Sequence, residues 1–259
     1  MSHKIDITEN GTTTLLTEGK YCDRNIEVNV NIASSGGTEI EDGLISGTLS
    51  GAYRNDRVTK VGDYALASQK LTSVDLPNAT HIGYRSFGGC SNLTQVNAPN
   101  VETLGGYSFV DCSALTSIDF PNIVDTGNYE FGSCKSLVTV NLPNLTRVRE
   151  NLFTNCVSIK KLDFPSVTQI GYAAIYNNYS LVAVILRAES VCDLTSSTVF
   201  KYCYHFLGTV NTTYNPEGLK DGYIYVPKNL IEQYKVATNW ATYADQFRAI
   251  EDYPEITGG

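Results

Sequence analysis

The chain has 259 residues, and its 42% of hydrophobic residues are enough for a sizeable core in one or two domains. Glycine (21) and tyrosine (17) are plentiful, whereas charged residues make up only 18%, which favours strands and turns over long helices. The formal net charge of -8 leaves no basic stripe to neutralise phosphates, so the composition argues against nucleic acid and against an anionic lipid surface as partners.

Residues 1–20 lack the apolar run of a secretory signal peptide. No stretch of the sequence approaches the roughly 18 to 20 apolar residues that a membrane helix needs. We therefore expect no signal peptide, no transmembrane segment and no membrane insertion.

Residues 1–33 predict a small three-stranded β module. A strand begins at Ile5, the Asn10-Gly11 pair is a strong hairpin signal, and alternating aliphatic residues over 26–32 predict a further strand. Three strands in so short a segment are marginal on their own. We expect this module to serve in docking or in formation of a homo-oligomer.

Residues 34–56 are predicted to be a linker and an N-terminal cap. The serines and glycines of 34–37 have the composition of a flexible linker. Residues 56–66 resemble half of a repeat unit, as expected at the start of a repeat array, because a free end would expose hydrophobic surface and unpaired strand edges.

Residues 57–187 repeat with a period of 22 residues, as from Pro77 to Pro99. When the units are aligned on one another, five positions keep the same type of residue from unit to unit, and we call each such position a column. The columns are proline at Pro77, Pro99, Pro121, Pro143 and Pro165; cysteine at Cys90, Cys112, Cys134 and Cys156; phenylalanine at Phe87, Phe109, Phe131 and Phe153; leucine or isoleucine at Leu71, Leu93, Leu115, Leu137, Ile159 and Leu181; and glycine at Gly83, Gly105, Gly127 and Gly171. Each unit predicts a short strand that proline ends, a turn that glycine permits, and an inward phenylalanine. One unit cannot bury its apolar face alone, so the units must stack into a β-rich solenoid.

The seven cysteines are interpreted as buried thiols. An odd count cannot pair completely, and the cysteine column accepts Asn178 in its next position, which a ladder of disulfides would not tolerate. Cys192, Cys203 and His205 are the other candidate cluster, but the sequence contains no Cys-x-x-Cys pair of the kind that zinc sites use. Disulfides and metal are the less favoured alternatives, and we predict no metal and no cofactor.

Residues 188–259 are predicted to contain an irregular loop, a last strand and a helical C-terminal cap. The stretch 189–219 departs from the period and is predicted to be the loop, and residues 223–226 are predicted to be the strand. Over 229–250, apolar residues recur at steps of three and four, which predicts one amphipathic helix or two short ones that close the core.

The string Leu-x-x-Val-x-Leu-Pro-(x)-Ile-Gly-x-x-x-Phe-x-x-Cys resembles the BspA-type leucine-rich repeats, also called the Treponema type, over roughly residues 57–226. That family is associated with bacterial surface adhesins and with phage or prophage virion proteins, so the resemblance implies binding without catalysis. The N-terminal string Ile-Thr-Glu-Asn-Gly-Thr resembles modules on structural proteins of phages that infect gut Firmicutes. This second resemblance implies docking onto other virion structural proteins.

Two surfaces are candidate ligand-binding sites. The polar residues between the buried positions of the strands are expected to form an outward ladder that suits the hydroxyls of a sugar: Ser73, Asp75, Gln95, Asn97, Ser117, Asp119, Thr139, Asn141, Lys161 and Asp163. Tyrosines near the turns are expected to form an aromatic edge: Tyr84, Tyr107, Tyr129, Tyr172, Tyr176 and Tyr179. The alternatives are a sheet face that is merely solvated and tyrosines that pack between coils.

The three histidines are scattered and no nucleophile elbow or phosphate-binding loop is present in the sequence, so we predict that the protein is not an enzyme. The favoured hypothesis is a virion component, such as a tail-tip, fibre or head-attached adhesin, that is assembled in the host cytoplasm and binds a bacterial surface glycan or protein. The alternatives are a BspA-type adhesin of the bacterial cell surface and an intracellular scaffold that binds proteins.

Overall fold

The computed structural model of the protein describes residues 5–9, 12–16, 38–43, 48–208, 211, 213–215, 217–218 and 220–258. At the N-terminus, β1 (Ile5–Glu9) and β2 (Thr12–Leu16) pair antiparallel. The strand predicted over 26–32 and the linker predicted over 34–37 lie outside the described residues.

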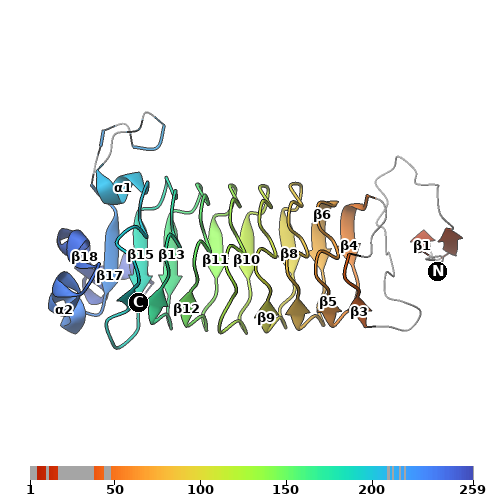
Figure 1. Ribbon diagram of the computed structural model, residues 1–259, viewed down its shortest axis with the longest axis horizontal. Coiled ribbons are helices and arrows are strands. Elements are labelled where there is room, and N and C mark those ends of the chain that lie inside the picture. The colour runs from red at the N-terminus through yellow and green to blue at the C-terminus, as the bar shows by residue number, and fades with distance from the viewer. Residues whose placement is uncertain are drawn as a thin grey trace.

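From residue 38 onward the chain winds into a parallel β solenoid with a sheet along each of two sides (Figure 1). The strands of the first side, which we call the first sheet, are β4 (Ser50–Arg54), β6 (Lys70–Asp75), β8 (Gln95–Asn97), β10 (Ser117–Asp119), β11 (Thr139–Asn141), β13 (Lys161–Phe164), β15 (Ala183–Leu186), β17 (Tyr223–Val226) and β18 (Phe247–Ala249). Their ladders are grouped as β4-β6-β8, β10-β11 and β13-β15-β17-β18. The second consists of β3 (Glu39–Ile40), β5 (Lys60–Val61), β7 (His81–Ile82), β9 (Thr103–Leu104), β12 (Arg147–Val148), β14 (Gln169–Ile170) and β16 (Asp193–Leu194). Paired residues such as Asp75 and Asn97 are 22 positions apart, so the predicted solenoid and its period are confirmed.

The third side of each coil is a series of turns, and its backbone hydrogen bonds between coils run in the opposite direction to those next to the second sheet. Next to the second sheet, the N–H of Gly83 donates to the carbonyl of Val61 in the preceding coil (2.8 Å). On the third side, the N–H of Phe87 donates to the carbonyl of Ser108 in the following coil (2.9 Å). Each coil is therefore bonded to both of its neighbours.

The conserved spacing of glycine has a different cause from the one that the sequence predicts. Gly83 is not among the residues with positive φ; the left-handed positions in this turn are held by Arg85 (φ 50°) and, one coil later, Tyr107 (φ 61°). A Cβ on Gly83 would lie 2.7 Å from the carbonyl carbon of Gly62 in the preceding coil. The glycine column therefore permits the close approach of neighbouring backbones rather than an unusual φ.

The phenylalanine column fills the interior from the third side, as predicted. Phe87, Phe109, Phe131 and Phe153 are fully buried, and their ring centroids follow one another at 5.2, 5.7 and 5.7 Å. The rings are nearly parallel, with interplanar angles of 5 to 11°. Stacking of equivalent side chains is thus what joins the small core of each coil into one continuous core.

The cysteine column is buried beside the phenylalanines, and its free thiols act as hydrogen-bond donors. Cys112 Sγ donates to the carbonyl of Phe87 in the preceding coil (3.2 Å), and Asn178 Nδ2 makes the equivalent bond to Phe153 (3.0 Å). Burial raises the pKa of the Cys90 thiol to about 11, which keeps it protonated and unreactive. The prediction of buried thiols is confirmed for the six cysteines of the described residues, and Asn178 shows why the column accepts asparagine.

The prediction of an irregular loop over 189–219 is wrong in part. β16 continues the second sheet, and Cys203 Sγ donates to the carbonyl of Ile175 (3.0 Å), which places Cys203 in the cysteine column. The coil is followed by the short helix α1 (Tyr204–Leu207). Extra residues before Cys203 shift it out of the 22-residue period, so the sequence pattern hides this coil. At the other end, the pairing of β3 with β5 and of β4 with β6 extends the coils to residues before 57.

The C-terminal cap contains short helices in place of one long amphipathic helix, which is the second of the two predicted alternatives. It contains η1 (Lys228–Leu230), α2 (Ile231–Val236) and η2 (Ala241–Gln246), followed by β18, η3 (Ile250–Asp252) and α3 (Pro254–Thr257). Phe247 lies in β18, which pairs with β17, because the last coil needs a strand to cover its edge. Trp240 is buried in the cap, and its Nε1 donates to the carbonyl of Cys192 (2.6 Å), which ties the cap to the last coils.

Replacing Asn178 by cysteine tests whether the column requires a donor. Asn178→Cys keeps the bond to Phe153 and removes the buried Oδ1, which has no partner among the described residues, so we expect it to raise the free energy of unfolding by about 1 kcal/mol. Asn178→Ala removes the donor and leaves a cavity, and it should cost about 1–3 kcal/mol. Urea unfolding followed by circular dichroism measures both. An equal change in the free energy of unfolding for the two variants would show that the hydrogen bond does not contribute to stability.

Candidate functional site

The outward face of the first sheet carries the polar ladder predicted as a ligand-binding surface, but its side chains bond to one another. Asn97 Nδ2 donates to Asp75 Oδ1 (2.8 Å), and Asn141 Nδ2 donates to Asp119 Oδ1 (2.8 Å). Asp75 also forms an ion pair with Arg54. The carboxylates and amides that were expected to meet a sugar are therefore engaged with the neighbouring coil.

Of the other residues of this ladder, three begin their strands (Gln95, Ser117 and Thr139), and Ser73 lies within β6. Ser73 is opposite Gln95, and Ser117 is opposite Thr139. Gln95 and Thr139 are exposed. The first half of the sheet is therefore open to solvent at these four side chains. They carry no chemical feature that selects a ligand.

The C-terminal tail of the chain covers the far end of the ladder. Lys161 Nζ donates to the carbonyl of Ile256 (3.2 Å), and Asp163 holds Arg187 by two bonds (2.9 and 2.7 Å). Arg187 also donates to the carbonyl of Thr257. The bond to Asp163 raises the pKa of the Arg187 guanidinium further. Lys161 and Asp163 thus anchor the tail, and the structure does not leave them free as the sequence-based hypothesis requires.

A small apolar cluster lies under this tail. Outward positions that are polar in earlier coils become Ala183 and Ile185 on β15 and Tyr225 on β17, and all three are buried. Ile250, Tyr253 and Ile256 of the tail pack against them and cover them. The change from polar to apolar residues therefore marks where the sheet stops facing solvent.

Tyrosines on the turn side form the second predicted surface, and part of it is a continuous row. We call Tyr64, Tyr84, Tyr107 and Tyr129 the tyrosine ridge. Their ring centroids follow one another at 5.3, 5.6 and 5.0 Å. Tyr64 is 49% exposed and Tyr84 37% exposed, so the ridge presents aromatic surface to solvent. Tyr64 was missed by the sequence pattern because it lies in the half-repeat before the regular columns.

The orientation of the rings decides what the ridge can offer to a ligand. Tyr107 and Tyr129 are stacked with an interplanar angle of 10°, and the Arg85 guanidinium carbon lies 5.1 Å from the Tyr107 centroid. These faces are already covered, so edges and hydroxyls are what remain at the centre of the ridge. Burial and then the neighbouring Tyr107 raise the pKa of Tyr129, so its hydroxyl stays a neutral donor and acceptor.

The three remaining predicted tyrosines do not join the ridge in one aromatic row. Tyr172 is 55% exposed. Tyr176 meets Tyr202 edge-on at 5.3 Å, and Tyr179 lies 5.0 Å from Tyr204. Tyr176 and Tyr179 therefore pack with residues of the last coil and α1, which is the alternative interpretation of packing between coils.

Within the described residues, no group of three or more His, Cys, Asp and Glu side chains is arranged to hold a metal ion. His205 Nδ1 instead lies 2.6 Å from Asp221 Oδ1, and Cys192 and Cys203 are buried in the core. None of the helices in the described part of the chain combines the length and apolar character that crossing a membrane requires.

The stacked 22-residue coils and their inward leucine, phenylalanine and cysteine columns define a leucine-rich-repeat solenoid. The repeats are of the BspA type: residues 59–182 match the model of the BspA type leucine rich repeat region in six copies. This confirms the resemblance found in the sequence for the array. No catalytic family is indicated, and no curated protein matches the chain.

Solved structures that resemble this chain include a leucine rich repeat protein from T. pallidum, at 20% identity over 66% of this chain and 73% of that one, with a TM-score of 0.39. A leucine-rich repeat protein from Bacteroides ovatus is 16% identical over 87% of this chain and 78% of that one, with a TM-score of 0.33. A leucine rich cell surface protein from Faecalibacterium prausnitzii is 14% identical over 78% and 92%, with a TM-score of 0.26.

Loosening the tail contact tests the role assigned to Asp163. Asp163→Asn removes the charge that holds Arg187, so we expect hydrogen exchange of residues 250–258 to become about fivefold faster, equivalent to about 1 kcal/mol for a half-exposed ion pair. Exchange measured by mass spectrometry reports this change. Asp119→Asn is the matched control because its partner Asn141 lies away from the tail, and it should leave the exchange of 250–258 unchanged. An equal response to both substitutions would contradict the anchoring role.

Proposed function

We propose that this protein is a non-catalytic binding protein that contacts the surface of a bacterial cell through the tyrosine ridge. The observation that carries the proposal is the row of four tyrosines in ring contact along one side of the solenoid, with Tyr64 and Tyr84 exposed. Tyrosine side chains combine a large rigid apolar area with a polar tip, and they are enriched where proteins bind partners.

The ridge is favoured over the outward strand face for a physical reason. On the strand face, Asp75 and Asp119 are satisfied by asparagines of the next coil, and a ligand would have to replace those bonds at little net gain. On the ridge, the hydroxyls and the exposed ring edges can be buried by a ligand without breaking a contact that holds the coils together. Apolar area that loses water on binding contributes directly to affinity.

A row of equally spaced rings fits an extended partner better than a compact one. Neighbouring centroids are 5.0 to 5.6 Å apart, so a polymer such as a surface glycan chain or an extended protein segment can contact several rings at once. Each ring adds a small contribution, and the sum gives useful affinity through several linked contacts.

The carrier of this binding activity is a second part of the proposal. The repeat type is in keeping with an adhesin on a bacterial cell surface, and the resemblance of residues 1–33 to phage modules favours a virion component in a tail tip, a fibre or a head-attached adhesin. In the virion case, the N-terminal module would dock onto other structural proteins of the particle and the solenoid would face the host. Electron microscopy of particles decorated with an antibody against the solenoid separates these carriers, because a virion component is labelled at a fixed position.

Binding of the full chain to a panel of intact gut bacterial cells tests the ridge. In a Tyr64→Ser, Tyr84→Ser double variant, we expect the affinity for the strains that bind the unchanged protein to fall at least tenfold, because each exposed tyrosine of a binding surface contributes about 1 kcal/mol or more. Flow cytometry with labelled protein gives the apparent Kd.

The matched control is a Gln95→Ala, Thr139→Ala double variant on the outward strand face, which should bind within about twofold of the unchanged protein. Urea midpoints of both double variants show that the solenoid is intact. If the strand-face variant loses binding and the ridge variant keeps it, the strand face is the site. If the unchanged protein binds no cell, the adhesion proposal is wrong.

A further inference from the structure

Residues 121–131 form half of one 22-residue coil. This coil departs from the pattern of its neighbours on the side of the second sheet. The inward residue there is aliphatic in the other coils, as in Leu104 and Val148, and both of these are buried in strands. The equivalent residue of this coil is Thr126. In the described part of the chain the second sheet is divided at this coil into β3-β5-β7-β9 and β12-β14-β16, and the ladder of the first sheet is also interrupted before β10 and after β11.

Backbone bonds that join neighbouring coils at this position are also interrupted. The N–H of Gly105 donates to the carbonyl of Ile82 in the preceding coil (2.8 Å). Among the described residues, the equivalent N–H groups of Gly127 and Arg149 make no such bond to the preceding coil. The coil is therefore attached on this side by fewer backbone hydrogen bonds than the coils before and after it.

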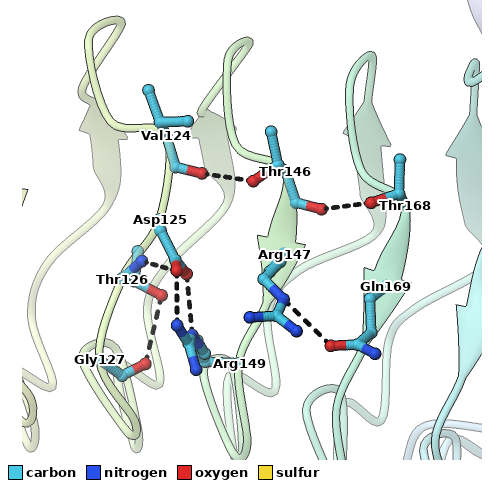
Figure 2. A network of polar contacts seen from close by, with 9 residues as sticks. All are labelled: Val124, Asp125, Thr126, Gly127, Thr146, Arg147, Arg149, Thr168 and Gln169. Carbon is cyan, nitrogen blue, oxygen red and sulfur yellow. Dashed lines mark hydrogen bonds and ion pairs between the residues drawn. The ribbon is translucent and has the colours of Figure 1, made fainter.

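Side chains replace part of that ladder (Figure 2). Arg149 donates twice to Asp125 (2.8 and 2.5 Å), and the Asp125 carboxylate also accepts from the backbone N–H of Thr126 (2.9 Å). Thr126 turns its hydroxyl to the carbonyl of Gly127 (3.2 Å). On this side the coil is thus joined to the next by the Asp125–Arg149 ion pair and by the bonds from Thr146 to the carbonyl of Val124.

The same coil buries a carboxyl group. Glu130 is 0% exposed, and neither of its side-chain oxygens has a hydrogen-bond partner among the described residues. A Cβ on Gly127 would lie 2.6 Å from Glu130 Oε1, so the carboxyl lies directly against the backbone of its own coil. The equivalent positions of the adjacent coils are Ser108, whose hydroxyl is also buried without a partner, and the fully buried Leu152.

The charges around Glu130 do not compensate for its burial. Loss of water raises the pKa of Glu130 to about 8, although the backbone N–H groups of Glu130 and Gly127 and the guanidinium of Arg149 each lower it. Arg149 is already paired with Asp125, whose own carboxylate raises the pKa of Glu130. These are the charged groups that face Glu130 from its own coil and from the coil that follows.

We propose that the coil of residues 121–131 is a pH-sensitive joint of the solenoid, which opens locally when Glu130 loses its proton. Inside the coil the backbone N–H groups of Glu130 and Gly127 favour a carboxylate at this place too little to offset its burial, and opening on the weakly bonded second-sheet side brings it to water. Tyr129 precedes Glu130 and stacks on Tyr107, so opening also separates the last ring of the ridge from the others. The joint is independent of what the ridge binds.

The direction of the pH effect follows from the two protonation states. Glu130 titrates near 8 in the closed coil and near its ordinary value of 4.5 once opened. The closed coil therefore binds the extra proton, and its stability is full below about pH 4.5 and is lost as the pH rises to about 8. One proton gives a tenfold increase in the opening constant for each pH unit in this window, with no further change above it.

Hydrogen exchange of the full chain between pH 5.5 and 9, corrected for the intrinsic exchange rate at each pH, tests the joint. We expect protection of peptides from 121–134 to fall about tenfold per pH unit up to about pH 8 and then to level off. Peptides from 77–90, an ordinary coil, should keep their protection. Glu130→Gln should abolish the pH dependence of 121–134, and Glu130→Leu should do so with higher protection throughout.

Glu150→Gln, which changes an exposed acid of the next coil, is the control and should behave like the unchanged protein. The same pH profile in the unchanged protein and in Glu130→Gln would overturn the proposal. So would an equal loss of protection in every coil, since that reports global unfolding. Either result leaves the ridge untouched, because the cell-binding experiment uses different residues.

Discussion

Each coil of this protein must place its residues directly over the equivalent residues of the coil before it, because both sheets and the turn side are held by hydrogen bonds between coils. The bond from Gly83 to Val61 runs backward and the bond from Phe87 to Ser108 runs forward, so the bonded positions must stay in register even where a coil has extra residues, as before Cys203. This register is what brings the phenylalanine rings into a stack and gives each buried thiol a carbonyl to meet. The core, the surface ladders and the tyrosine ridge all follow from that one geometric condition.

The same condition separates the two predicted surfaces. Side chains in one column lie within reach of one another, so an aspartate followed by an asparagine forms a hydrogen bond along the solenoid and is no longer available, as in Asp75 and Asn97. Tyrosines in neighbouring coils also touch, but ring contact leaves part of each ring exposed, as at Tyr64 and Tyr84. A polar ladder thus becomes part of the scaffold, whereas an aromatic ladder remains a surface that a partner can use.

The sequence was sufficient for the solenoid, its period and the inward columns, because a periodic signal repeated at Phe87, Phe109 and Phe131 cannot be mistaken for another fold. It failed where the period fails: the coil that contains Cys203 and the strand that contains Phe247 carry the same geometry without the same spacing. It also could not show that Asp163 would be used to hold the C-terminal tail, since that contact joins residues far apart in the chain. The sequence did not single out Glu130, because residue type alone does not distinguish one buried acid from the many acids on the surface.

Contact between neighbouring coils alone has a consequence for the size of the protein. Trp240 and its neighbours meet the last coils only, through the bond to Cys192, and the middle coils contact just the coil before and the coil after. Inserting or deleting one whole coil therefore leaves both ends intact and moves them apart or together by about 4.8 Å. The number of coils therefore sets the length of the ridge and the distance that it can span. Evolution can change that length in fixed steps while the fold stays the same.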